Sequence, residues 1–163
     1  MSDFTIRPVT HDEIDELFAM IRELAVFEKL EDQLVTTPDR LRTVLFEQEG
    51  GPEGLVAETA QGLVGYALYF ENFSSFLCRR GIYLEDLYVR PNSRGNGVGR
   101  AFLTRLAQIA VERECGRMEW AVLDWNTNAI QFYESIGATI LEDWRFVRMD
   151  RAGIEALATV PNA

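Results

Sequence analysis

Apolar side chains recur along the chain with two different spacings. Residues 4–8 alternate between apolar and polar, as in a β-strand, whereas the apolar positions of 14–27 follow the spacing of a helix. Thr10 and Glu13 have the spacing of a capping box, which opens a helix. A threonine followed by proline is typical of a helix start, so a second, short helix is expected over 38–48.

The rest of the chain continues this alternation. The order β-α-α-β-β-β-α-β-α-β predicts a mixed α/β fold, with helices on both faces of a largely antiparallel sheet. No linker-like tract or internal repeat interrupts the pattern, so one domain over residues 1–163 is expected. The later elements are strands at 54–59, 63–70 and 82–89, a helix with Val98 and Phe102 facing inward, a strand at 118–123, a helix at 126–136 and a final strand at 139–149.

Composition narrows the chemistry. With 16 basic and 26 acidic side chains the net charge is −10, which repels phosphate backbones and makes nucleic acid an unexpected partner. No apolar run approaches the length of a membrane span and no signal segment opens the chain, so a cytoplasmic protein without membrane partners is expected. His11 is the single histidine, and the two cysteines lack metal-ligand spacing, so no metal is expected. Cys78 and Cys115 are interpreted as packing thiols, with a disulfide as the alternative.

A glycine-rich segment between a strand and a helix carries two arginines, although the chain as a whole is negatively charged. It lacks the Gly-x-Gly-x-x-Gly spacing of dinucleotide loops and the Gly-Lys-Ser/Thr of phosphate loops. Glycines let the backbone turn its N–H groups toward an anion, and the helix start adds about half a positive charge. An anion-binding turn is therefore predicted, with a flexible solvated turn as the alternative. The segment reads Arg94-Gly95-Asn96-Gly97-Val98-Gly99-Arg100.

Two further features break local patterns. Glu85 and Asp86 lie in the middle of the apolar run 82–89, where consecutive side chains point to opposite faces. At least one carboxylate then faces a covered side, which indicates either a functional site or a structural salt bridge. Tyr133 shares a helical apolar stripe with Phe132, and periodicity alone places it in the core.

These residues resemble the GNAT-superfamily N-acetyltransferases. Their signature, Arg/Gln-x-x-Gly-x-Gly/Ala between a strand and a helix, is matched by residues 94–99. Within the superfamily the chain is most similar to the diamine acetyltransferases, of the spermidine/spermine and thialysine types. The similarity extends over the stretches 4–8, 21–25 with Glu28, 83–87, 125–126 and 132–133.

The resemblance implies acetyl-CoA as co-substrate, a GNAT fold and a homodimer with substrate sites near the subunit interface. Residues 94–100 would hold the pyrophosphate, Leu87 and Val89 would offer backbone groups to the pantetheine arm, and Asn126 would contact the cofactor.

The resemblance also implies the catalytic roles. Tyr133 would be the general acid for the departing thiolate, and Glu85 would engage the amine directly or through water. Phe27, Glu28 and Asp86 would line the substrate site. The expected reaction is direct acetyl transfer, in a ternary complex, to a primary amine of a small cationic substrate such as a polyamine, a diamine or a thialysine-like amino acid. The alternatives are a non-catalytic acyl-CoA-binding module and a peptide or protein N-acetyltransferase.

Two segments depart from the polyamine enzymes. The chain carries Arg79 and Arg80 where a carboxylate is expected, and Glu142 and Asp143 only approximate an acidic residue in a shortened stretch. A smaller, amino-acid-like amine, whose carboxylate would meet an arginine, is therefore a second candidate.

Overall fold

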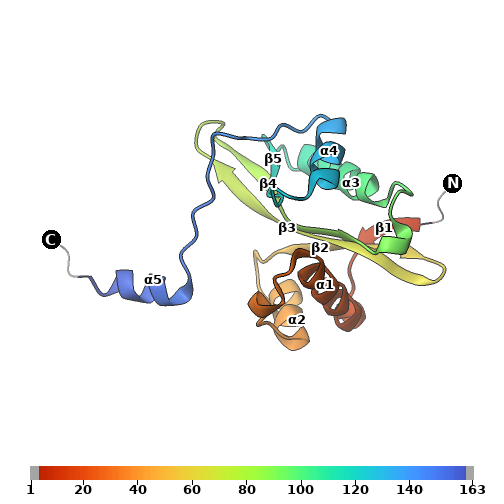
Figure 1. Cartoon of the computed structure of the whole chain (residues 1–163), viewed down its shortest axis with the longest axis horizontal. Coiled ribbons are helices and arrows are strands. Elements are labelled where there is room, and N and C mark those ends of the chain that lie inside the picture. The colour runs from red at the N-terminus through yellow and green to blue at the C-terminus, as the bar shows by residue number, and fades with distance from the viewer. Residues whose placement is uncertain (1–3, 161–163) are drawn as a thin grey trace. The chain divides into compact units, whose positions relative to one another are not determined.

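The computed structural model describes residues 4–160, which form two compact units divided after residue 121. The first unit contains a sheet and three helices, and the second contains two further helices (Figure 1). The single domain expected over residues 1–163 stays a prediction.

The first unit is built on one five-stranded sheet whose strands follow the order β1-β2-β3-β4-β5. The first three strand pairs are antiparallel and the β4–β5 pair is parallel. This arrangement confirms the predicted mixed, largely antiparallel sheet. The strands are β1 (Phe4–Pro8), β2 (Glu53–Thr59), β3 (Gly62–Ser74), β4 (Arg79–Val89) and β5 (Met118–Trp120).

Helices cover both faces of this sheet (Figure 1). One face carries α1 (Ile14–Glu28) and α2 (Pro38–Phe46), and the other carries α3 (Val98–Glu112). Short 3-10 turns lie at His11–Glu13, Glu31–Gln33 and Pro91–Ser93.

The hydrophobic core has a layer on each side of the sheet. On the α1 side, Leu17 and Met20 are fully buried with Tyr66 of β3. On the α3 side, a Cβ at Gly65 would lie 3.3 Å from the Phe102 ring, so glycine lets this helix approach the sheet closely. Each large apolar side chain buried in this way stabilises the fold by about 1.5–3 kcal/mol. The core therefore fixes α1 and α3 against opposite faces of β3 and β4.

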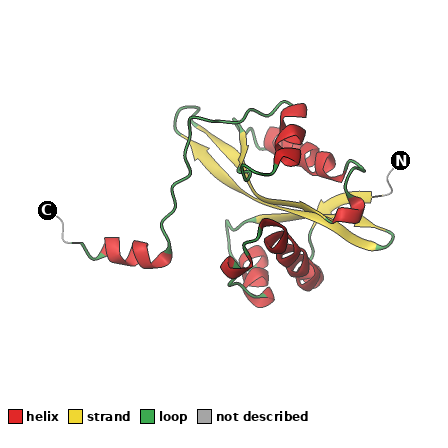
Figure 2. Cartoon of the chain, viewed as in Figure 1, coloured by secondary structure: helices red, strands yellow, loops and turns green. Residues whose placement is uncertain are grey.

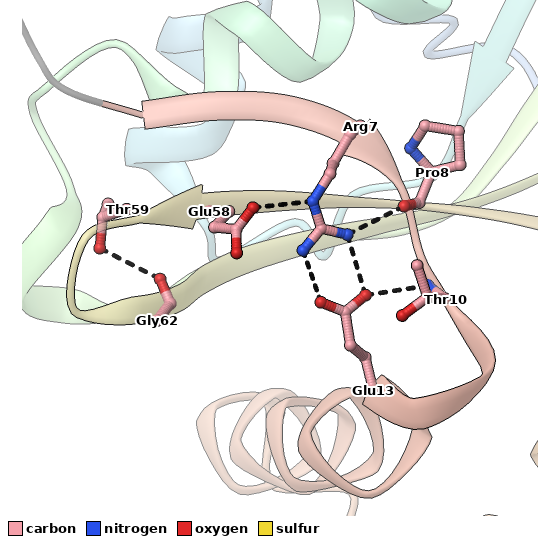
Figure 3. Close-up of polar contacts among 7 residues, drawn as sticks. All are labelled: Arg7, Pro8, Thr10, Glu13, Glu58, Thr59 and Gly62. Carbon is pink, nitrogen blue, oxygen red and sulfur yellow. Dashed lines mark hydrogen bonds and ion pairs between the residues drawn. The ribbon is translucent and has the colours of Figure 1, made fainter.

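A polar cluster joins the first strand to the first helix (Figure 3). The Arg7 guanidinium donates to Glu58 of β2 at 2.8 Å and forms a two-pronged pair with Glu13. The Thr10 N–H donates to Glu13 Oε2 at 2.9 Å, as the capping-box spacing predicts. The hydrogen bond from Arg7 has the largest effect on the pKa of Glu13, and together with the hydrogen bonds from Thr10 it lowers this pKa to about 2.

The second unit differs from the sequence prediction at its end. It contains α4 (Thr127–Ser135), close to the expected helix, and an unexpected helix, α5 (Arg151–Ala158), capped by Asp150. The final strand predicted at 139–149 is wrong, because these residues form neither helix nor strand (Figure 2). A strand requires a partner for its backbone hydrogen bonds. The described part of this unit contains no other strand, so the apolar alternation around Trp144 and Phe146 has nothing to pair with.

The structure also differs from the interpretation of both cysteines as packing thiols. Both are free, Cys115 is partly buried, and Cys78 is exposed in the β3–β4 turn with a φ of 49°. Cys78 is therefore not a packing thiol, because the turn points it away from the core.

The Arg7 cluster yields a stability prediction. Glu13→Gln removes the carboxylate that Arg7 and the helix start both use, so the free energy of unfolding should fall by about 1 kcal/mol at pH 7. Because the pKa of Glu13 is lowered in the folded protein, its contribution is complete above pH 4.5 and is lost as the pH falls toward 2. Urea denaturation at pH 7 and pH 4 measures the loss in the free energy of unfolding. Glu47→Gln, at an exposed position, is the control. An equal loss in both Gln variants would contradict the account.

Candidate active site

One edge of β4 is paired only in part. β3 pairs with β4 along most of its length, whereas β5 pairs only with Ile82–Leu84. The Arg90 N–H donates to the Val64 carbonyl of β3 at 2.9 Å. Backbone groups of successive residues in a strand point to opposite edges, so every second residue counted back from Arg90 directs its backbone groups toward β3. Those of Leu87 and Val89 then face the opposite edge, beyond the end of the β5 pairing. Both residues lie where the resemblance places a pantetheine arm.

A β-bulge separates the two carboxylates of β4. Asp86 pairs with Leu68 and Leu84 pairs with Tyr69, which leaves Glu85 without a partner on β3. A bulge bends the strand and re-aims side chains locally. Glu85 is exposed here, whereas Asp86 is partly buried on the side of α1. The bulge explains how an apolar strand accommodates two consecutive acidic residues.

Three carboxylates interact at this point. Asp86 of β4 lies close enough to its neighbour Glu85, and to Glu28, the last residue of α1, to be repelled by both charges. Burial, followed by the Glu85 and Glu28 charges, raises the pKa of Asp86 to about 6, against the lowering effect of a Tyr66 hydrogen bond. Burial also raises the pKa of Glu28.

The carboxylate cluster formed by Glu28, Glu85 and Asp86 has no cationic partner among residues 4–160. The structural salt bridge considered for Glu85 and Asp86 is therefore not the explanation. The Tyr66 hydroxyl donates to Asp86 Oδ2 at 3.3 Å. A cluster of this kind attracts a cation from outside the protein.

The glycine-rich turn has the backbone that an anion-binding loop needs. Gly95 and Gly97 have φ values of 78° and 83°, in the left-handed region that favours glycine, and a Cβ at either would meet no atom within 4 Å. Gly97 immediately precedes α3, whose first residue, Val98, is buried and anchors the helix start. Arg100 is exposed in the first turn of α3. The open space and the N–H groups of this helix start suit a phosphate group.

Arg94 connects this turn to α1. Its Nε donates to the Val89 carbonyl at 2.7 Å, and its guanidinium lies over the Phe27 ring at 5.0 Å and the Tyr88 ring at 5.6 Å. Arg94 is exposed, and these contacts hold it against the protein surface. Phe27 and the predicted cofactor loop come together through this contact.

A second set of contacts holds α1 against the end of β4. Glu23 of α1 accepts hydrogen bonds from the Tyr88 hydroxyl at 3.1 Å and from Arg90 at 2.9 Å. Arg90 also pairs with Glu16 at 2.7 Å. Sequence reasoning missed these residues and Tyr66, because their roles depend on the register between strands and on which face α1 covers.

The remaining predicted site residues lie in the second unit. Asn126 caps α4 by accepting from the Ala129 N–H at 3.3 Å, and Tyr133 is buried with its ring 5.4 Å from that of Phe132. Glu142 and Asp143 are exposed. The roles of Asn126 and Tyr133 toward cofactor and substrate stay predictions.

Comparison with known proteins identifies the class of enzyme. The Acetyltransferase (GNAT) family matches residues 16–138, and this chain belongs to it. The chain is an acetyltransferase, as the sequence predicted. No helix within residues 4–160 combines the length and apolar character that crossing a membrane requires.

Individual relatives narrow the resemblance further. The chain is 36% identical to thialysine N-epsilon-acetyltransferase of Sus scrofa, over 97% of this chain and 99% of the relative. It is 32% identical to spermidine/spermine N(1)-acetyltransferase-like protein 1 of Homo sapiens, over 93% of this chain and 23% of that protein. Among solved structures, the integron cassette protein VCH_CASS6 of V. cholerae superimposes with a TM-score of 0.79 and 25% identity, covering 98% of this chain and 100% of that one. These similarities confirm the predicted subfamily resemblance.

The carboxylate cluster predicts a stabilising substitution. The pKa of Asp86 is higher in the folded protein than in the unfolded chain. The free energy of unfolding therefore falls as the pH rises from about 4 through 6 and Asp86 ionises. Asp86→Asn removes this charge and retains an acceptor for Tyr66, so it should stabilise the protein by about 2 kcal/mol at pH 8 and by little at pH 4. Thermal and urea denaturation at both pH values measure the effect, with the exposed Asp32→Asn as control. Destabilisation at pH 8 would contradict the assigned environment of Asp86.

The glycine-rich turn predicts the effect of a charge reversal. Arg100→Glu places a negative charge at an exposed position beside the α3 start, so acetyl-CoA should bind about tenfold more weakly, with a smaller difference at high salt. Calorimetric titration measures the affinity. The matched control is Arg40→Glu on α2, which covers the other face of the sheet. Equal effects of the two reversals would argue against anion binding at the turn.

Proposed function

We propose that this enzyme transfers the acetyl group of acetyl-CoA to a primary amine of a small cationic substrate, directly and within a ternary complex. The observation that carries the proposal is the carboxylate cluster, which has no protein cation and lies directly beside Leu87 on β4. An ammonium group would supply the missing positive charge next to the strand edge that would hold the acyl donor.

The cofactor side rests on backbone geometry. The edge of β4 at Leu87 and Val89 would pair with the pantetheine arm as with an additional strand, and the turn 94–100 would bind the pyrophosphate through N–H groups. The Val89 carbonyl already accepts from Arg94, so the Val89 N–H and the groups of Leu87 are the available ones. Asn126 would contact the cofactor as the resemblance implies.

The chemistry needs an amine without its proton. At a lysine-like pKa of about 10.4, roughly one amine in 10³ is neutral at pH 7. The carboxylates that attract the ammonium also oppose its deprotonation, so binding and activation compete. Glu85 would engage the amine through water at the exposed bulge, with Glu28, Asp86 and Phe27 lining the site. The amine would then attack the thioester with no covalent enzyme intermediate.

The leaving group needs a proton. A thiol has a pKa of about 8.5 and a tyrosine one of about 10, so Tyr133 would be protonated at neutral pH and able to donate to the thiolate. This role rests on chemistry and resemblance.

Substrate recognition rests mainly on positive charge. Arg80 pairs with Glu71 at 2.8 Å and lies five residues before Glu85, about 17 Å along an extended strand. A thialysine-like amino acid separates its side-chain amine from its carboxylate by roughly 7 Å. The arginine and glutamate side chains can cover the remaining distance, so the sequence-based suggestion for Arg79 and Arg80 stays a prediction. We propose diamines and thialysine-like amines as substrates, recognised through their ammonium groups.

Assembly and location complete the proposal. The homodimer, the cytoplasmic location and the single domain over 1–163 follow from the resemblance and the composition. A peptide or protein substrate has no specific observation in its favour.

Thiol release tests the function. The enzyme and acetyl-CoA are incubated with thialysine, lysine, putrescine or spermidine, and free thiol and acetylated product are measured. We expect product with at least one diamine or thialysine-like amine. If no amine in this panel causes thiol release, the proposed substrate class is rejected and the peptide alternative is favoured.

A substitution of Tyr133 tests its proposed role as general acid. Tyr133→Phe should lower kcat about 10²-fold while acetyl-CoA affinity stays within about twofold. Tyr69→Phe, which removes a hydroxyl bonded to Glu53 at 3.1 Å, is the matched control. Unchanged turnover in Tyr133→Phe would reject the general-acid role.

A further inference from the structure

The sheet face that α1 covers continues beyond the end of that helix. Tyr66, Leu68, Phe70 and Asn72 lie at alternate positions of β3 and therefore share this face. Tyr66 and Leu68 belong to the core packed against α1, whereas Phe70 is 37% exposed. The side chains of the first unit therefore leave this face partly open from Phe70 onward.

Three strands place side chains in one row at this point. Tyr83 of β4 pairs with Phe70 of β3 and with Glu119 of β5, and cross-strand partners share a face. The rings of Phe70 and Tyr83 lie 5.1 Å apart. Asp86 pairs with Leu68, two residues before Phe70, so the row lies about 7 Å along the sheet from Asp86. The aromatic pair and Glu119 are thus neighbours of the carboxylate cluster.

An amide side chain reaches across β4 to hold Glu119. Asn72 Nδ2 donates to Glu119 Oε2 at 2.9 Å, although Asn72 is on β3 and Glu119 is on β5. Gly81 of β4 makes room for this contact, because a Cβ there would lie 2.5 Å from Asn72 Oδ1. That oxygen is buried without a hydrogen-bond partner among residues 4–160. A buried oxygen without a partner costs stability, and such costs are enriched at functional sites.

Arg117 forms an ion pair with Glu119. Its Nε lies 2.8 Å from the same Oε2 that Asn72 contacts, and the side chains of Arg117 and Glu119 are 41% and 32% exposed. Within the described part of the chain, the polar contacts of this pair use Oε2 of Glu119 and Nε of Arg117. Glu119 Oε1 therefore remains as an acceptor, and the two terminal nitrogens of Arg117 remain as donors, for a partner from outside the protein.

On the basis of the proposed function, we propose that Glu119 and Arg117 form a specificity site for the amino-acid end of the substrate. Glu119 Oε1 accepts from the α-ammonium, and the terminal nitrogens of Arg117 bind the α-carboxylate. The side-chain ammonium of the same molecule binds at the carboxylate cluster. The substrate class is then an α-amino acid with a side-chain amine, such as thialysine.

The dimensions of the surface fit an amino acid of this length. Glu119 lies one row along the sheet from Asp86, about 7 Å, and one strand spacing across it, about 4.8 Å, so the two backbones are about 8 Å apart. Thialysine separates its side-chain amine from its carboxylate by roughly 7 Å. Its thioether chain would cross the rings of Phe70 and Tyr83, and sulfur packs favourably against aromatic rings.

The ion pair distinguishes an amino acid from a diamine. A diamine offers an ammonium to Glu119 but no anion to Arg117, whereas an amino acid satisfies both through charge-assisted hydrogen bonds. Arg80 precedes Gly81, the strand partner of Asn72, so its side chain lies on the opposite face, where it pairs with Glu71. Arg117 is therefore the arginine on the same face as the cluster.

The experiment compares two substrates that differ in one group. Bis(2-aminoethyl) sulfide is thialysine without its carboxylate. With saturating acetyl-CoA, kcat and KM for both compounds are measured in wild type, Arg117→Gln, Glu119→Gln and Arg80→Gln. Arg105→Gln, which removes an arginine paired with Glu112 at 3.2 Å, is the matched control.

Wild type should favour thialysine about tenfold or more in kcat/KM. Arg117→Gln should remove most of this preference by raising the KM for thialysine about tenfold, with kcat and the diamine changed less than about twofold. Glu119→Gln should raise KM for both substrates about fivefold, because both present an ammonium to it. Arg80→Gln and Arg105→Gln should keep the preference of wild type.

The outcomes separate this inference from the proposed function. If wild type acetylates the diamine or spermidine as well as thialysine or better, the specificity site is overturned and the proposed function stands. This comparison uses the wild-type enzyme, so an unfolded variant cannot obscure it. An equal loss with both substrates in Arg117→Gln, or loss of the preference in Arg80→Gln instead, overturns the role of Arg117. If wild type acetylates none of the amines, the proposed function is overturned and this inference with it.

Discussion

β4 has a strand partner along one edge but only a short partner along the other. β5 pairs with it at Ile82–Leu84 and no further, so the backbone groups beyond that point lack a neighbouring strand in the sheet. Backbone polar groups without partners are costly unless water or a ligand satisfies them. The bulge at Glu85 and the turn 94–100 follow directly along the same strand. The predicted acyl-donor edge, the predicted anion-binding turn and the acidic residues therefore lie along one strand and the turn that follows it.

Many acidic residues of the first unit form ion pairs within the fold, as Glu23 does with Arg90 and Glu13 with Arg7. The Glu28, Glu85 and Asp86 cluster lies outside these pairs, and burial together with the charges of the two glutamates raises the pKa of Asp86. Such an arrangement sacrifices stability where a ligand is to bind. A cationic substrate bound there would relieve the repulsion, which would link substrate binding to the charge state of the site.

The parts of the site that depend on local sequence could be predicted. The glycine-rich turn needs positive φ at Gly95 and Gly97, and the capping box depends on two residues three apart, so spacing was enough for both. The neighbouring carboxylates stood out because they interrupt an apolar strand. The bulge at Glu85, the Tyr66–Asp86 hydrogen bond and the position of Arg94 depend on register between distant strands, which composition and periodicity do not determine. The strand expected at 139–149 failed for a related reason, because an alternating pattern cannot reveal whether a partner strand exists.

The central claim is that a substrate cation completes the charge of the cluster around Asp86. Calorimetric titration of the coenzyme A complex with a diamine, repeated in buffers of different ionisation enthalpy, measures the protons released on binding. The account predicts release of a substantial fraction of a proton at pH 6, because the bound cation lowers a pKa that is near 6 beforehand, and almost none at pH 8. Binding at pH 6 with no proton release, or with proton uptake, would contradict it.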